Sequence, residues 1–149
     1  MTRTALGILA AGLLVAAAPA PDDAVKKEMA RLEGTWSVTA LTNDGKKGTD
    51  EDVRKIRVIL KGNAYTAKVG DMVIEEGTWT IDPTQKPKTI DATATSGDDK
   101  GKKSLGIYEL DGDSLKMCFG PAGKDVRPKE FESKEGSKYE LGVYKREKP

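Results

Sequence analysis

Hydrophobic and polar residues alternate along most of the chain after residue 34, which is the pattern of half-buried β-strands. The first such segment places Trp36, Val38 and Ala40 on one face. Turn-forming residues separate the segments, and Asp111-Gly112 is the strongest hairpin signal among them. We therefore predict eight strands, at residues 35–40, 56–60, 65–69, 72–81, 89–95, 105–110, 115–119 and 139–146.

The segment before the first strand has the spacing of a helix. Val25, Met29 and Leu32 recur within residues 22–33 at intervals that place them on one helical face, and Gly34 follows as a stop signal. The opposite face is charged and suits solvent. We expect the apolar face of this helix to cover one open end of the β-structure.

Three local features are predicted within the strand region. Residues 49–54 suit one helical turn, because a threonine that caps well is followed by acidic residues. Gly77 lies inside the long fourth strand, where we expect a β-bulge that re-aims Trp79. Residues 120–137 form the longest irregular stretch, with a brief strand pairing expected around Phe131.

The order of these elements predicts an all-β fold. Eight strands joined mostly by short hairpins form an up-and-down antiparallel meander, and a flat sheet of that size would leave two unpaired edges. Closure removes the edges and buries one residue in two. We predict an eight-stranded antiparallel up-and-down barrel with a short N-terminal helix; the alternative is a two-sheet sandwich.

The first twenty residues differ from the rest of the chain. Arg3 is followed by an uncharged apolar run over residues 5–18 and by small residues up to position 20. This is the layout of a secretory signal peptide, and the apolar run is short for a membrane span. We expect residues 1–20 to be removed on export, residues 21–149 to form one secreted or periplasmic domain, and no membrane span to remain. An uncleaved N-terminal anchor is the alternative.

Composition excludes several classes of function. Without Arg3, the 25 basic residues become 24, which equals the 24 acidic residues and leaves no basic excess for binding nucleic acid. The chain contains no histidine, which excludes Ser-His triads, Cys-His dyads and most zinc sites. Cys118 is the only cysteine, so no intramolecular disulfide forms. We expect no metal and no cofactor.

The Gly-x-Trp motif at Gly34-Thr35-Trp36, placed between a short helix and seven further strands, resembles the lipocalin and calycin layout. This resemblance implies that Trp36 closes the barrel floor and that Lys145 or Arg146, with Arg146 preferred, packs across it. The chain also resembles an uncharacterised family of small, secreted, lipocalin-like domains from planctomycete bacteria. That resemblance rests on Leu32-Glu33-Gly34-Thr35-Trp36, Asn43-Asp44-Gly45-Lys46, Glu76-Gly77-Thr78-Trp79, Asp82-Pro83-Thr84, Lys86-Pro87-Lys88-Thr89-Ile90-Asp91, Gly106-Ile107-Tyr108-Glu109-Leu110-Asp111-Gly112-Asp113 and Leu115-Lys116-Met117-Cys118.

Small side chains on the inward face, several of them alanines, leave open whether the barrel interior is filled or keeps a void for one ligand. If a small apolar ligand enters, the candidate contacts are Tyr65, Trp79, Tyr108 and Met117. Trp79 has core packing as its alternative role. Cys118 should point away from the interior as a half-buried structural thiol.

The function predicted from the sequence is a monomeric, exported binding module of unknown ligand that performs no catalysis. One alternative is a scaffold whose outer face binds a protein of the cell envelope. The other is a hydrolase, in which Glu75, Glu76 or Glu109 would form a carboxylate pair with an aspartate. Such a pair would have to converge in a cleft, with at least one raised pKa.

Overall fold

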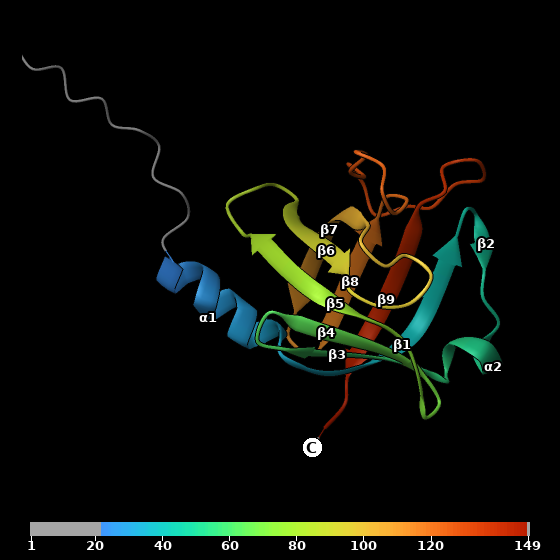
Figure 1. The fold of residues 1–149 in the computed structure, drawn as a ribbon, viewed down its shortest axis with the longest axis horizontal. Helices are drawn as coiled ribbons and strands as arrows, with labels where there is room; N and C mark the ends of the chain where they lie inside the picture. The colour runs from blue at the N-terminus through green and yellow to red at the C-terminus, as the bar shows by residue number, and fades with distance from the viewer. Residues whose placement is uncertain (1–21, 149) are drawn as a thin grey trace, which may run out of the picture.

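The computed structural model describes residues 22–148, so the predicted signal peptide lies outside the described residues. Two helices and nine strands follow one another along the chain (Figure 1). The helices are α1 (Asp22–Leu32) and α2 (Asp50–Val53). The strands are β1 (Gly34–Asn43), β2 (Lys46–Lys47), β3 (Ile56–Lys61), β4 (Ala64–Val69), β5 (Met72–Asp82), β6 (Lys88–Ala94), β7 (Lys103–Asp111), β8 (Ser114–Phe119) and β9 (Glu140–Arg146).

The strands form a closed antiparallel barrel. Each strand from β3 to β8 pairs with the next in the chain, and β1 pairs with both β3 and β9. The closing ladder runs from Trp36 opposite Arg146 to Asn43 opposite Glu140. Because this ladder completes the ring, the predicted eight-stranded barrel is confirmed and the two-sheet alternative is excluded. The two-residue β2 is an addition at the end of β1.

The seam between β1 and β3 is only partly a ladder. The two strands pair from Gly34 opposite Leu60 to Ser37 opposite Arg57, beyond which they diverge. The short helix α2 packs against β1 there, and its Val53 is buried in the core. Thr49 caps the helix by accepting a hydrogen bond from the Asp52 amide, as its sequence position predicts.

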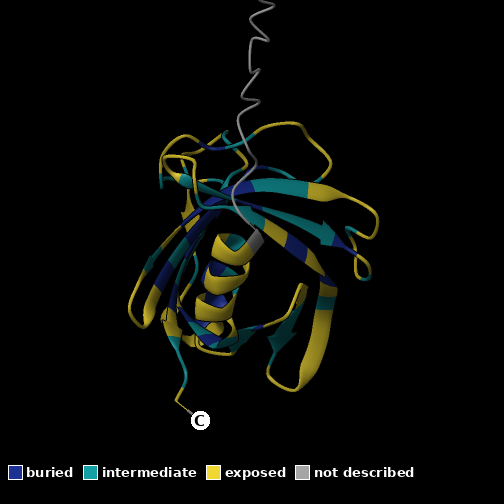
Figure 2. Cartoon of the chain, turned by 90° about the vertical axis from the view of Figure 1, so that its left-hand side faces the viewer, coloured by how far each residue is buried: buried dark blue, intermediate teal, exposed yellow. Residues whose placement is uncertain are grey.

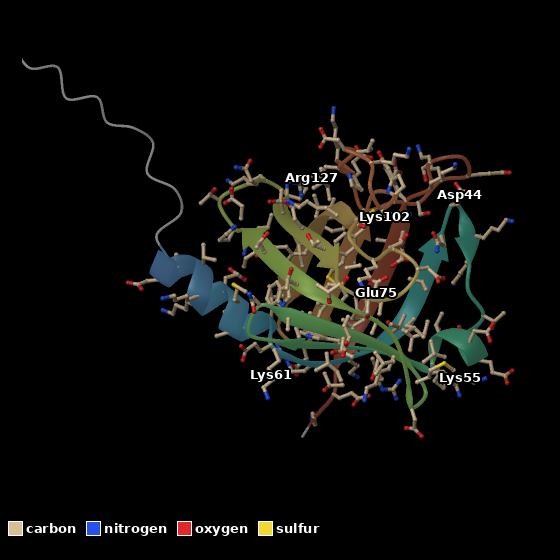
Figure 3. The ribbon with its side chains drawn as sticks, in the orientation of Figure 1. Asp44, Lys55, Lys61, Glu75, Lys102 and Arg127 are labelled. Atoms are coloured by element: carbon tan, nitrogen blue, oxygen red, sulfur yellow. The ribbon has the colours of Figure 1, made fainter. Side chains whose placement is uncertain are left out.

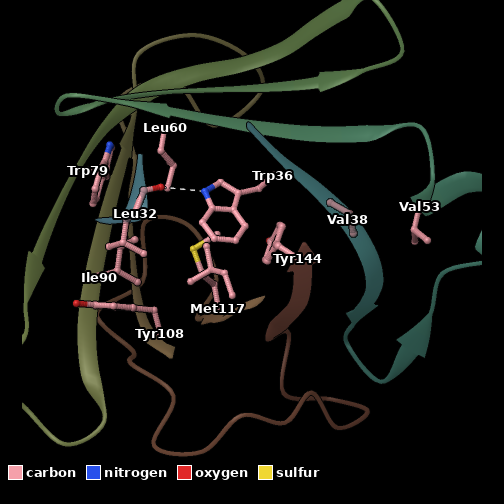
Figure 4. Close-up of a cluster of buried hydrophobic side chains, with 11 residues drawn as sticks. Leu32, Trp36, Val38, Val53, Leu60, Trp79, Ile90, Tyr108, Met117 and Tyr144 are labelled. Carbon is pink, nitrogen blue, oxygen red and sulfur yellow. Dashed lines mark hydrogen bonds between the residues drawn. The ribbon is translucent and has the colours of Figure 1, made fainter. Parts of the chain in front are cut away.

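Seen from its own side, α1 lies in front of one end of the barrel (Figure 2), and its last turn packs on the hydrophobic core. Leu32, on the last turn of α1, is fully buried, and Met29 packs against the same cluster. Trp36 lies beneath this turn, and its indole nitrogen donates a 2.9 Å hydrogen bond to the Leu32 carbonyl (Figure 4). Glu28 ties the helix to the wall through an ion pair with Lys88 at 3.2 Å. Helix α1 is therefore part of the closed end.

The predicted bulge at Gly77 is wrong. Gly77 lies in regular register opposite Tyr65, and the irregularity between β4 and β5 occurs nearer the hairpin, where Ile74 is the extra residue. Glycine is needed at position 77 for close packing instead. A Cβ atom there would lie 2.5 Å from the Tyr65 ring and 2.2 Å from the Thr93 carbonyl oxygen. A second irregularity interrupts the pairing of β1 with β9 at Thr39.

The long segment between β8 and β9 contains no strand within the part of the chain that the structure describes, so the pairing predicted around Phe131 is wrong. This segment lies over the outer wall instead. Arg127, labelled in Figure 3, forms an ion pair with Asp91 at 2.7 Å. The carbonyl of Glu132 lies 3.5 Å from the Cys118 sulfur. Cys118 is consequently fully buried, not half-buried as predicted, and burial raises the pKa of its thiol.

Candidate functional site

The barrel encloses a cavity of about 430 Å³ that opens at the end away from α1. This volume lies in the range typical of sites for small molecules. The sequence left open whether the interior is filled or hollow. The structure shows both: the end of the barrel beside α1 is packed, and the end away from α1 is hollow. The deep part of the cavity is lined mainly by apolar side chains, among them Val38, Leu60, Trp79, Ile90 and Met117.

Small side chains create the space. Ala67, Ala92 and Ala94 line the cavity from β4 and β6, where larger residues would fill it. Gly142 acts similarly on β9, since a Cβ atom there would lie 2.2 Å from the Tyr144 hydroxyl. The Tyr144 ring is thus able to lie close along the wall instead of crossing the cavity. The alternation of the sequence predicted the inward alanines, and the strand register brings those of β4 and β6 to the wall of the same cavity.

Three of the four candidate contact residues line this cavity. Trp79 and Met117 lie on its deep wall, and Tyr65 lies nearer the mouth, where its hydroxyl donates a 2.7 Å hydrogen bond to Glu75. The Trp79 indole nitrogen donates to the Ala64 carbonyl at 3.2 Å, which fixes the ring against the wall. These three residues share one cavity although they belong to β4, β5 and β8.

Tyr108, the fourth candidate, does not line the cavity. It points inward from β7 but lies deeper, at the α1 end, where it is buried. The Lys88 ammonium lies 6.0 Å from the centre of its ring, and burial together with the nearby Glu28 raises the pKa of its hydroxyl. Strand alternation identified the correct face of β7 but not the depth of the residue along the barrel axis. Tyr108 belongs to the packed end.

The two residues expected to close the floor are in contact. The Arg146 guanidinium lies 4.3 Å from the centre of the Trp36 ring. Its nitrogens also donate to the carbonyls of Glu33 and Arg31, which are exposed acceptors at the C-terminal end of α1. Asp113 forms a 3.2 Å ion pair with the same guanidinium. Arg146 thus joins the last strand to the helix end and to the floor.

Charged side chains gather at the mouth of the cavity. Glu75 and Lys102, both labelled in Figure 3, come from β5 and from the turn before β7. Asp99 forms a 3.4 Å ion pair with Lys102. Lys138 and Glu140 complete the group, at the start of β9. The mouth therefore combines three carboxylates with two ammonium groups, over an apolar interior.

Glu140 differs from the other mouth residues. Within residues 22–148, no lysine or arginine nitrogen lies within 4.0 Å of its carboxylate, and its one side-chain hydrogen bond comes from Asn43 at 3.5 Å. Burial raises the pKa of this carboxyl, and the negative charges of Glu75 and Asp99 raise it further. Sequence reasoning missed Glu140. Its signal was the alternation that places Glu140, Gly142 and Tyr144 on one inward face of β9.

Glu140→Gln is expected to stabilise the folded protein near neutral pH by about 1 kcal/mol, the ordinary size of a single-residue effect. A carboxyl whose pKa is raised by folding favours the folded state below its unfolded pKa and loses that contribution as the pH rises through the folded value. Urea unfolding of both proteins should therefore show a gap near pH 7.5 that shrinks toward pH 4. A gap that stays constant with pH would contradict this account of Glu140.

Most of the glutamates considered for a hydrolytic pair lie outside the cavity. Of the three glutamates considered, only Glu75 lines the cavity. Glu76 is exposed, and Glu109 is exposed and lies 3.7 Å from Lys116 in an ion pair. Among the described residues, no three acidic or cysteine side chains are grouped closely enough to hold a metal ion.

A closed eight-stranded antiparallel barrel with one packed end and a cavity of about 430 Å³ has the architecture of barrels that can hold one small molecule. Residues 32–117 match the model of the lipocalin-like domain family. The match covers more than half of the chain, and the chain therefore belongs to the lipocalin-like domain family. No curated protein and no solved structure matches the chain significantly. In the described part of the chain, no helix is both long and apolar enough to cross a membrane.

Proposed function

We propose that this protein is an exported module that binds one small, largely apolar molecule in its barrel cavity and performs no catalysis on it. The observation that carries the proposal is the cavity of about 430 Å³ above a closed floor. A cavity of this size inside the barrel forfeits packing that a filled core would have gained. Such a space is understandable in a barrel whose purpose is to take up a ligand.

Binding without chemistry fits the state of the carboxylates at the mouth. A hydrolytic pair needs two carboxyl groups free to act as acid and base. Glu75 accepts the hydrogen bond of Tyr65, and Asp99 is paired with Lys102. Glu140 is thus left without a second free carboxylate beside it. Export rests on the sequence of residues 1–20, and a secreted or periplasmic location is part of the proposal.

Ala92→Phe is expected to weaken ligand binding at least about tenfold, because a phenyl ring at this inward position of β6 fills part of the cavity that the ligand would use. The neutral fluorescent probe N-phenyl-1-naphthylamine reports entry into an apolar cavity through its increase in emission. The matched control is Thr80→Phe, which adds the same ring to an exposed position of the adjacent strand β5. Equal affinities for both variants would place the binding site outside the barrel.

A second function, docking to an envelope protein, is favoured by one surface feature. Met72, Val73 and Ile74 are consecutive at the start of β5 and are 67%, 46% and 47% exposed. Three exposed large apolar residues in one hairpin are unusual on a monomeric surface. Since Ile74 also lines the cavity mouth, a partner bound to this hairpin would sit beside the ligand entrance.

A further inference from the structure

Glu140 is held rigidly at the cavity mouth. Its backbone pairs with Asn43 on one side and with Phe119 on the other, so two ladders fix its position on β9. Its side chain lines the cavity together with Tyr144, two residues further along the same face. A group fixed in this way acts as a preorganised contact for whatever enters.

This carboxylate has no charged partner of its own. In the described part of the chain the nearest polar side-chain contact is the Asn43 amide at 3.5 Å, which is a weak hydrogen bond. Glu140 is half-buried in the cavity wall. A carboxylate that has lost part of its hydration is normally accompanied by a cation or by several strong donors, which compensate that loss. Glu140 lacks both on the protein side while facing open space.

Carboxylates outnumber ammonium groups around the mouth by three to two. Glu75 and Asp99 line the same mouth, and their charges act against ionisation of Glu140. Lys102 is engaged by Asp99 at 3.4 Å. The ammonium of Lys138 lines the rim but lies outside ion-pair distance of any carboxylate among residues 22–148. The position beside Glu140 therefore suits an incoming cation.

We propose that the ligand is an amphipathic amine, whose ammonium group pairs with Glu140 at the mouth while its apolar body lies along Trp79 and Met117. This inference rests on the proposed binding function and names the chemical class of the ligand. The ammonium group supplies the missing counter-ion, and the low-dielectric cavity strengthens the pair. The raised pKa of Glu140 agrees with a carboxylate that has no cation within ion-pair distance among residues 22–148. A fatty acid would add a fourth carboxylate to a mouth whose three carboxylates already outnumber its two ammonium groups.

The test compares three probes that differ only in their head group. Isothermal titration calorimetry of the purified protein near pH 7.5 with n-octylamine, n-octanol and n-octanoate should show the amine binding at least about tenfold more tightly than the alcohol. Octanoate should bind more weakly than the alcohol. Equal binding of amine and alcohol would overturn the inference about the head group but leave the apolar-ligand function standing. Binding of none of the three would count against the function itself.

Two variants assign the preference to one residue. Glu140→Gln keeps the shape of the side chain and removes its charge, so the ratio of amine to alcohol affinity should fall to about one. Glu109→Gln is the matched control, because Glu109 is an exposed glutamate that does not line the cavity, and it should keep the wild-type ratio. An amine preference that survives in Glu140→Gln would overturn the assignment. The wild-type ratio tests the ligand class even if this variant folds poorly.

Discussion

Trp36→Ala is expected to lower the free energy of unfolding by about 4 kcal/mol, the cost usual for deleting a fully buried large aromatic side chain. Trp36 is fully buried, bonds the last turn of α1 through its indole nitrogen, and carries the Arg146 guanidinium on its ring. Its loss removes packing from the helix, from β1 and from β9 together. The closed end of the barrel should therefore open as one unit.

Urea unfolding followed by far-UV circular dichroism measures this effect, and Trp79 remains as a fluorescent probe of the barrel. The control is Trp36→Phe, which keeps an aromatic ring but removes the hydrogen bond to Leu32, and it should cost about half as much. A loss in Trp36→Ala below about 1 kcal/mol would mean that the floor is held by other contacts. The same result would remove the structural role expected for Trp36.

Gly77→Ala is expected to destabilise the protein by about 3 kcal/mol, which is large for the addition of one methyl group. The new Cβ atom would lie 2.2 Å from the Thr93 carbonyl oxygen, which belongs to the backbone of a paired strand. It would also lie 2.5 Å from the ring of Tyr65. The ring would have to move, and its hydrogen bond to Glu75 at the cavity mouth would be disturbed.

The matched control for this prediction is Gly70→Asn in the β4–β5 hairpin. No atom lies within 4 Å of a Cβ atom at Gly70, and asparagine tolerates its left-handed backbone at φ +60°. The control should therefore cost only a few tenths of a kcal/mol. Equal losses in the two variants would show that position 77 tolerates a side chain and that the strands adjust. Probe binding should weaken only in Gly77→Ala.

These results would show that the two ends of the barrel have different roles. The α1 end is packed around Trp36, and its residues serve stability. The opposite end is hollow, and Glu140 in its mouth is expected to cost stability that a neutral side chain would recover. Natural proteins keep destabilising groups mainly where function requires them. The expected gain in stability of Glu140→Gln and its expected loss of amine preference are thus two consequences of one arrangement.

The sequence by itself determined the eight barrel strands, their order and the N-terminal helix. These elements depend on local information: alternation at every second residue, turn residues between segments, and the helical spacing of Val25, Met29 and Leu32. The sequence favoured closure over a two-sheet sandwich, and the ladder between β1 and β9 decided between them. The inward faces of β4, β5 and β8, with Tyr65, Trp79 and Met117, followed from the same alternation.

Only the tertiary structure decided how deep each inward residue lies. Depth depends on the stagger between neighbouring strands, which is set by non-local pairing and by the irregularities at Thr39 and Ile74. This stagger places Tyr108 in the packed end and brings Glu140 to the mouth with Glu75, although 65 positions separate the two glutamates in the chain. Alternation reports which face a side chain occupies. It contains no information about height along the barrel axis, and that height is what separates core from cavity.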